Sequence, residues 1–144
     1  MDENEDHDHI LYSSFNQDAS CFVTGTEKGF RIYNSFPLKS NYERDLGGGI
    51  GIVEMLYRCN ILALVGGGKK PKFNKNFVIF WDDKQEKIVS ELRFESKILN
   101  LKLKKDKIIV VLEQNIFIFN FNNFNILDKF DTASNPHGKN IPIS

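Results

Sequence analysis

The sequence has few cysteines and prolines, no net charge and no long apolar run. Two cysteines in 144 residues cannot build a disulfide framework. The 19 basic residues balance the 19 acidic ones, which disfavours a general nucleic-acid binder because that class carries a basic excess. The longest apolar runs, 61–65 and 108–112, are far shorter than the roughly 20 residues that span a bilayer.

The start of the chain also lacks the features of a targeting signal. Residues 1–9 read MDENEDHDH, whereas a signal peptide needs a basic start and an apolar segment. We expect this polar acidic arm to be disordered. The expectation for the whole chain is a soluble intracellular protein.

Helical periodicity is absent, and strand patterns take its place. No window of 11 or more residues shows a capped 3.6-residue apolar period. Leu99, Leu101 and Leu103 alternate with polar residues, and Ile108–Leu112 resembles a strand buried on both sides. Short polar turns separate the apolar runs. The sequence predicts twelve antiparallel strands at 10–15, 20–25, 29–34, 42–46, 51–57, 61–66, 77–82, 87–94, 97–103, 107–113, 115–121 and 126–131.

These strands form three groups of four with a repeated ending. The third strand of each group ends in an aromatic residue followed by Asn or Asp, at spacings of 48 and 38 residues: Tyr33-Asn34, Trp81-Asp82 and Phe119-Asn120. Such a period is typical of WD-type propeller blades. We expect the aromatic ring to pack between blades and the polar side chain to hold the following turn.

The predicted fold is therefore all-β, a WD40-like β-propeller with three four-stranded antiparallel blades. The expected blades are residues 10–48, 49–95 and 96–134, and residues 135–144 are expected to start a fourth blade or form a tail. Natural propellers close with four to eight blades. Three blades therefore indicate an incomplete propeller and a piece of something larger.

No motif predicts catalysis, a cofactor or a metal site. The segment 66–70 does not fit the phosphate-loop pattern. That pattern requires Gly at its first position and Ser or Thr at its last, where this chain has Ala63 and Lys70. The glycines at 47–51 fail the dinucleotide pattern. The pair His7 and His9 lacks a third fixed ligand, and neither cysteine has a His or Asp arrangement that indicates a nucleophile.

One loop concentrates positive charge. Lysines occur at positions 69, 70, 72 and 75 of the segment 69–76, called the basic loop below, beside Pro71 and Phe73. Positive charge around an exposed aromatic suits an acidic partner or an anionic membrane. The alternative is a solvated loop with Phe73 packed back onto the domain. The loop is longer than a usual hairpin connection, and long loops often carry function.

Several strings together resemble one known family. They are Phe15-Asn16-Gln17-Asp18, Gly29-Phe30-Arg31-Ile32-Tyr33, Leu62-Ala63-Leu64-Val65-Gly66-Gly67-Gly68, Pro71-Lys72-Phe73 and Val78-Ile79-Phe80-Trp81-Asp82-Asp83. Over residues 10–138 the chain resembles the PROPPIN family, the WIPI-like phosphoinositide-binding β-propellers of autophagy, and within it the WIPI3/WIPI4-like branch. That family has seven blades, so the resemblance covers the first three.

The resemblance implies a scaffold without enzymatic activity. Family members bind phosphatidylinositol 3-phosphate and the 3,5-bisphosphate through an Arg-Arg-Gly motif of later blades. All four arginines here are isolated, so we expect no lipid-binding residues and no family-type lipid binding in this segment. The full-length form would be cytoplasmic and peripheral at phagophore or endosomal membranes.

The resemblance also implies a partner surface on these blades. The partner would be the autophagy lipid-transfer protein or adaptors of the lipid-conjugation machinery. The matching positions are Asn16, Asp18, Lys69, Lys70, Pro71, Lys72 and Phe73. Asn16 and Asp18 have a structural alternative, a turn built by their own side chains. The alternative function is a stand-alone protein-interaction module that dimerises.

Overall fold

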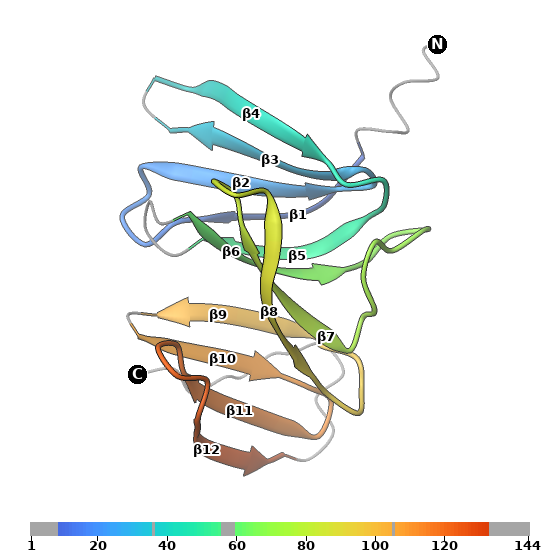
Figure 1. The fold of residues 1–144 in the computed structure, drawn as a ribbon, viewed down its shortest axis with the longest axis vertical. Coiled ribbons are helices and arrows are strands. Elements are labelled where there is room, and N and C mark those ends of the chain that lie inside the picture. The colour runs from blue at the N-terminus through green and yellow to red at the C-terminus, as the bar shows by residue number, and fades with distance from the viewer. Residues whose placement is uncertain (1–8, 36, 56–59, 105, 133–144) are drawn as a thin grey trace.

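The computed structural model describes residues 9–35, 37–55, 60–104 and 106–132, and these contain twelve strands and no helix. The strands form three antiparallel four-stranded sheets, each a meander of consecutive strands (Figure 1). The first sheet holds β1 (Ile10–Phe15), β2 (Cys21–Thr26), β3 (Gly29–Asn34) and β4 (Lys39–Asp45). The second holds β5 (Ile50–Met55), β6 (Ile61–Gly66), β7 (Phe77–Asp82) and β8 (Lys87–Arg93). The third holds β9 (Asn100–Lys104), β10 (Lys107–Val111), β11 (Asn115–Asn120) and β12 (Ile126–Asp131).

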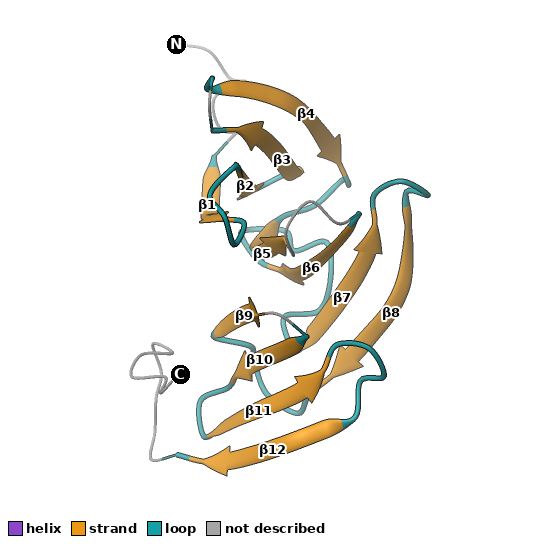
Figure 2. Cartoon of the chain, turned by 90° about the vertical axis from the view of Figure 1, so that its left-hand side faces the viewer, coloured by secondary structure: helices purple, strands orange, loops and turns teal. Residues whose placement is uncertain are grey.

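The three sheets follow one another like blades, with the first strand of each on the inner side (Figure 2). β5 contacts both β1 and β9, whereas every residue of β12 is exposed. This arrangement confirms the predicted fold class. The expected acidic arm up to Asp8 and the expected fourth-blade start at 135–144 lie outside the described residues.

Two apolar cores hold neighbouring sheets together. The core between the first and second sheets includes Val23, Phe30, Ile50, Leu64 and Trp81. The core between the second and third sheets includes Val65, Phe80, Leu101, Ile108 and Phe119. Since a fully buried aliphatic or aromatic side chain contributes roughly 1.5–3 kcal/mol, these cores dominate the stability of the stack.

A close approach of backbones explains one glycine at the first of these junctions. A Cβ atom on Gly25 would overlap the backbone carbonyl oxygen of Ile50. The first and second sheets therefore pack this tightly only because β2 has no side chain at that position.

The predicted strands agree with the observed ones to within a few residues. The largest differences are at β4, which begins at Lys39 rather than 42, and at β9, which begins at Asn100 rather than 97. Ile98 does not pair as a strand because its N–H donates 3.0 Å to the carbonyl of Lys75 in the basic loop. The predicted end of the fifth strand at residue 57 lies outside the described residues.

The outer face of the first sheet carries an aromatic stack. The Phe22 and Tyr33 rings lie 4.6 Å apart and nearly parallel, and the Phe15 ring lies 5.5 Å from that of Phe22. Phe15 is 61% exposed. Apolar surface is thus open on the face turned away from the second sheet.

Candidate functional site

The aromatic rings of the three repeated aromatic–Asn/Asp endings differ in where they pack. Trp81 lies in the core between the first and second sheets, and Phe119 in the core between the second and third. Tyr33 instead stacks on Phe22 on the outer face of the first sheet. At the second and third repeats the aromatic ring therefore lies in a core between two sheets. At the first repeat, the ring belongs to the face that has no described neighbour.

The polar residues of these endings accept hydrogen bonds from nearby groups. The Asp82 carboxylate accepts hydrogen bonds from the N–H groups of Lys84 and Gln85 at 2.9 and 3.1 Å. Asn120 accepts from the N–H of Asn122 at 2.8 Å. Both side chains therefore bind backbone N–H groups of the turn that follows. Asn34 accepts from the thiol of the neighbouring strand residue Cys21, at 3.8 Å.

Asn16 lies buried in the turn after β1. It is 3% exposed, its side-chain oxygen accepts from the N–H of Cys21 at 3.1 Å, and its amide group donates to Ser20 at 3.1 Å. Asp18 is exposed and accepts from the N–H of Ser20 at 3.0 Å. The turn interpretation therefore describes Asn16, while Asp18 keeps its carboxylate at the surface.

The basic loop is attached to both the first and second sheets. The N–H of Gly49 donates to the Lys70 carbonyl at 2.8 Å, and the N–H of Lys72 donates to the Gly49 carbonyl at 3.0 Å. The N–H of Lys69 donates 3.0 Å to the Glu27 carboxylate on the β2–β3 turn. The loop thus has a defined course, and the side chains of Lys69, Lys70 and Lys72 are exposed on it.

Phe73 does not project from this loop. It is partly buried and packs against the core between the first and second sheets, as the solvated-loop alternative expects. The loop therefore presents lysines and Pro71 to solvent while the aromatic ring anchors it from below.

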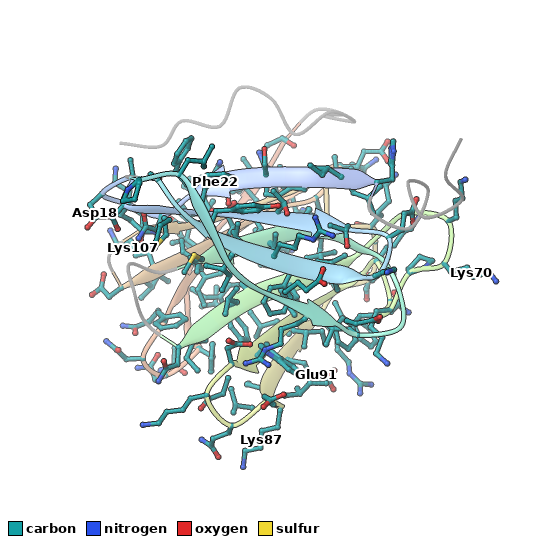
Figure 3. The ribbon with its side chains drawn as sticks, turned by 90° about the horizontal axis from the view of Figure 1, so that it is seen from above. Asp18, Phe22, Lys70, Lys87, Glu91 and Lys107 are labelled. Carbon is teal, nitrogen blue, oxygen red and sulfur yellow. The ribbon has the colours of Figure 1, made fainter. Side chains whose placement is uncertain are left out.

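The predicted partner residues belong to two separate surfaces. Figure 3 shows Asp18 and Lys70 at opposite ends of the molecule. The connectivity explains this separation, because Asp18 follows the first strand of a sheet whereas Lys70 follows the second strand, which runs the opposite way. A single small ligand cannot contact both groups.

The first and second sheets are also joined by a polar contact that the sequence motifs did not reveal. Arg44 of β4 pairs with Asp83 at 2.8 Å, and the indole N–H of Trp81 donates to the same carboxylate at 3.0 Å. The Asp83 side chain is 8% exposed. A nearly buried carboxylate is thereby neutralised across the junction.

A second polar cluster lies between the inner strands. The Tyr12 hydroxyl of β1 donates 2.6 Å to the Glu54 carboxylate of β5, which is 5% exposed. Burial raises the pKa of Glu54, and the hydrogen bond from Tyr12 and the charge of Lys102 on β9 oppose that rise. Burial, reinforced by the Glu54 charge and hydrogen bond, raises the pKa of Tyr12 well above its usual range.

Gln17 connects all three sheets. Its amide nitrogen donates to the carbonyl of Met55 in β5 at 3.0 Å and to that of Leu103 in β9 at 3.1 Å. In the sequence, the Tyr12–Glu54 contact is indicated only by a carboxylate within the apolar segment 52–55. The Gln17 contacts are indicated only by a polar turn at 16–18. Neither signal identifies the partner, because each partner lies at least 38 residues away in the chain.

The described part of the chain offers no arrangement for metal chemistry. Among its residues, no group of three or more His, Cys, Asp or Glu side chains is placed to hold a metal ion. Cys21 is buried, and Cys59 lies outside the described residues. Within the described ranges there is also no helix long and apolar enough to span a membrane.

Three meander sheets stacked through their first strands define the class of protein, a β-propeller of the WD40 type. The profile of the PROPPIN family matches residues 10–142. The chain is 40% identical to autophagy-related protein 18 of Candida glabrata over 90% of its own length and 25% of that protein. It is 46% identical to SVP1-like protein 2 of Saccharomyces cerevisiae over 78% of its own length and 27% of that protein.

Solved structures agree with this assignment. Kluyveromyces lactis Hsv2 superposes with a TM-score of 0.73 at 30% identity, covering 85% of this chain and 37% of that one. KlAtg21, solved in complex with the coiled coil of AgAtg16, superposes with a TM-score of 0.72 at 26% identity, covering 85% and 39%. The chain belongs to the PROPPIN family. It spans about a quarter to a third of the curated relatives that it matches.

Proposed function

We propose that this chain supplies partner-binding blades of a non-catalytic autophagy scaffold of the WIPI3/WIPI4-like branch. In the full-length form, later blades would bind phosphatidylinositol 3-phosphate or the 3,5-bisphosphate at phagophore or endosomal membranes. The first three blades would recruit the autophagy lipid-transfer protein. Membership of the PROPPIN family supports the pathway, since relatives include an autophagy-related protein and a KlAtg21–AgAtg16 complex.

The basic loop is the observation that carries the partner-binding part of this proposal. It is fixed through its backbone to Gly49 and Glu27, yet all four of its lysines are exposed. A surface that is ordered before binding loses less conformational entropy on association. Its unbalanced charge suits an acidic segment of the partner.

A capture assay tests this proposal. The immobilised chain is incubated with purified lipid-transfer protein, and the variant Lys69→Glu/Lys70→Glu/Lys72→Glu is compared with Lys84→Glu/Lys87→Glu. We expect at least tenfold weaker capture for the loop variant and less than twofold change for the control, because the control lysines lie on the β7–β8 hairpin. Equal capture by both variants would refute the loop as the contact.

Two further measurements address the remaining parts. Comparing capture by Asp18→Ala with capture by Asp128→Ala tests whether the end of the molecule opposite the basic loop takes part.

Sedimentation with vesicles containing phosphatidylinositol 3-phosphate should show no lipid-specific binding by this segment, because it has no Arg-Arg pair. A dimer in sedimentation analysis, with no capture of the lipid-transfer protein, would favour the stand-alone interaction module instead.

A further inference from the structure

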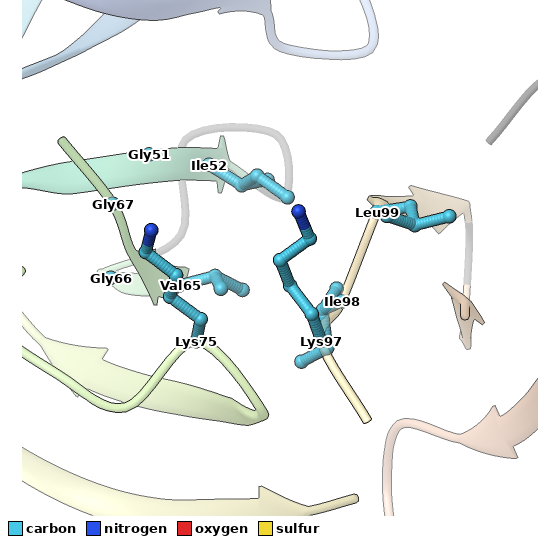
Figure 4. Close-up of a pocket in the computed structure, with 9 residues that line it drawn as sticks. All are labelled: Gly51, Ile52, Val65, Gly66, Gly67, Lys75, Lys97, Ile98 and Leu99. Carbon is cyan, nitrogen blue, oxygen red and sulfur yellow. The ribbon is translucent and has the colours of Figure 1, made fainter. Parts of the chain in front are cut away.

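A small cavity opens where the second and third sheets meet (Figure 4). Its volume is about 240 Å³, and aliphatic side chains of Ile52, Val65 and Ile98 form part of its wall. Lys75 of the basic loop and Lys97 of the β8–β9 connection also line it. In Figure 4 the ammonium ends of both lysines extend toward the side on which Gly51 and Ile52 lie.

The two lysines are held in place by their backbones. The N–H of Ile98, next to Lys97, donates to the carbonyl of Lys75 at 3.0 Å. Three residues before Lys97, the N–H of Phe94 donates to the carbonyl of Asn76, the residue after Lys75, at 3.0 Å. The basic loop and the β8–β9 connection are therefore joined directly through their backbones, which keeps the backbones of Lys75 and Lys97 close together.

Neither lysine is neutralised by the described residues. Every ion pair between described side chains uses an arginine, and no carboxylate lines the cavity. The chain has no net charge overall, yet this end of the second sheet carries the four lysines of the basic loop with no acid between residues 55 and 81. Both lysines are exposed, so each attracts an anion only weakly by itself, and the attraction depends on the two charges acting together.

The size and charge of the cavity select the ligand. It is smaller than the roughly 300–1,000 Å³ of pockets that enclose drug-sized molecules, so it suits a single chemical group. A phosphate monoester carries about −1.5 to −2 charges at neutral pH and three acceptor oxygens. That charge matches two ammonium groups better than a single carboxylate does.

The surroundings favour a soluble ligand over a membrane. Interfacial binding sites combine basic residues with apolar side chains that enter the lipid. No residue of the basic loop or of the cavity wall is among the exposed large apolar side chains of the described chain. Phe73, the aromatic residue of the loop, is packed against the core.

We propose that Lys75 and Lys97 form a phosphate-binding site for a phosphorylated serine or threonine side chain of a protein partner. The phosphate would lie between the two ammonium groups, and the aliphatic wall would contact the neighbouring part of the bound peptide. This site differs from the contact assigned above to Lys69, Lys70 and Lys72, so either can fail without the other.

An NMR titration with O-phospho-L-serine tests the site. The amide signals of Gly66 and Gly67, which also line the cavity, are followed in the purified chain, with L-serine as the matched ligand. We expect saturable shifts with phosphoserine only. Lys75→Gln and Lys97→Gln should each weaken binding about three- to fivefold, the change expected for one exposed charge pair, and the double variant should weaken it about nine- to twenty-five-fold.

The control variant is Lys84→Gln, which removes an exposed lysine of the β7–β8 hairpin from outside the cavity. Its affinity should stay within twofold of the unmodified chain. Unchanged binding in the double variant, equal weakening by Lys84→Gln, or equal shifts with L-serine would each overturn the site. Sedimentation with phosphoinositide vesicles that is lost in the double variant and unaffected by phosphoserine would also overturn it, in favour of a membrane headgroup.

Discussion

The contact between Tyr12 and Glu54 allows a quantitative test of how the inner strands are joined. Tyr12→Phe keeps the ring, which packs against both inter-sheet cores, and removes only the hydroxyl that donates to Glu54 at 2.6 Å. A hydrogen bond to a charged group contributes roughly 1.5–3 kcal/mol. Because Tyr12 is only partly buried, we expect a loss near the lower limit, about 1.5 kcal/mol.

The assay is urea unfolding at pH 7, followed by tryptophan fluorescence of Trp81. With a slope of about 2 kcal/mol per molar urea, the expected loss shifts the midpoint by roughly 0.8 M. In a Glu54→Gln background the partner is uncharged, so the same substitution should cost only about 1 kcal/mol or less. Additive effects in this double-mutant cycle would refute direct coupling between the two residues.

The pH dependence of the same cycle has a defined sign. Burial raises the folded-state pKa of Glu54 above its unfolded value, which is about 4.3. The folded state then binds more protons, so the Glu54 contribution to stability falls as pH rises from the unfolded pKa through the folded pKa. Glu54→Gln should remove this fall, and an unchanged pH profile would contradict the assigned burial.

Three other substitutions test separate contacts by the same unfolding assay. Arg44→Ala should lower the free energy of unfolding by about 2 kcal/mol, because it leaves the nearly buried Asp83 carboxylate unneutralised. Arg31→Ala should lower it by under about 1 kcal/mol, because the partner of Arg31 is 61% exposed. Equal losses would contradict the inter-sheet role of Arg44. Gln17→Ala should lower the free energy of unfolding by about 1 kcal/mol, because it removes the hydrogen bonds to the second and third sheets. An unchanged urea midpoint would contradict a stabilising role for these hydrogen bonds. Hydrogen bonds to the Asp82 carboxylate, chiefly that from the Gln85 N–H, lower the pKa of Asp82. Asp82→Asn should therefore destabilise the fold at pH 7 but not below the folded-state pKa, where Asp82 is protonated in both states. A loss of stability that is independent of pH would contradict the role of the Asp82 charge in the turn.

The strands were predictable because alternation and turn chemistry are local properties. Leu101 and Leu103 lie buried on the face toward the second sheet, and Ile108 to Val111 are buried on both faces. The aromatic–Asn/Asp endings likewise identified the third strands, since they follow from the repeat. The start of β9 was displaced because it depends on a non-local bond, that of the Ile98 N–H to the Lys75 carbonyl.

The site was less predictable because it depends on how the sheets pack. Asn16 matched the family pattern as a partner residue, but its side chain is consumed in a turn that a sequence reading could not distinguish from a surface contact. Glu54 stood out only as a carboxylate in an apolar segment, and nothing local indicated Tyr12 as its partner. The separation of Asp18 from the basic loop follows from strand direction, which the predicted strand order already contained.

The most direct test of the proposed function is the affinity of the chain for the purified autophagy lipid-transfer protein, measured by calorimetry at two salt concentrations. We expect saturable binding that weakens with salt, because exposed lysines of the basic loop would make the contact. We also expect at least tenfold weaker binding for Lys69→Glu/Lys70→Glu/Lys72→Glu. Binding that is absent, or that is equally strong in this variant, would contradict the proposed function.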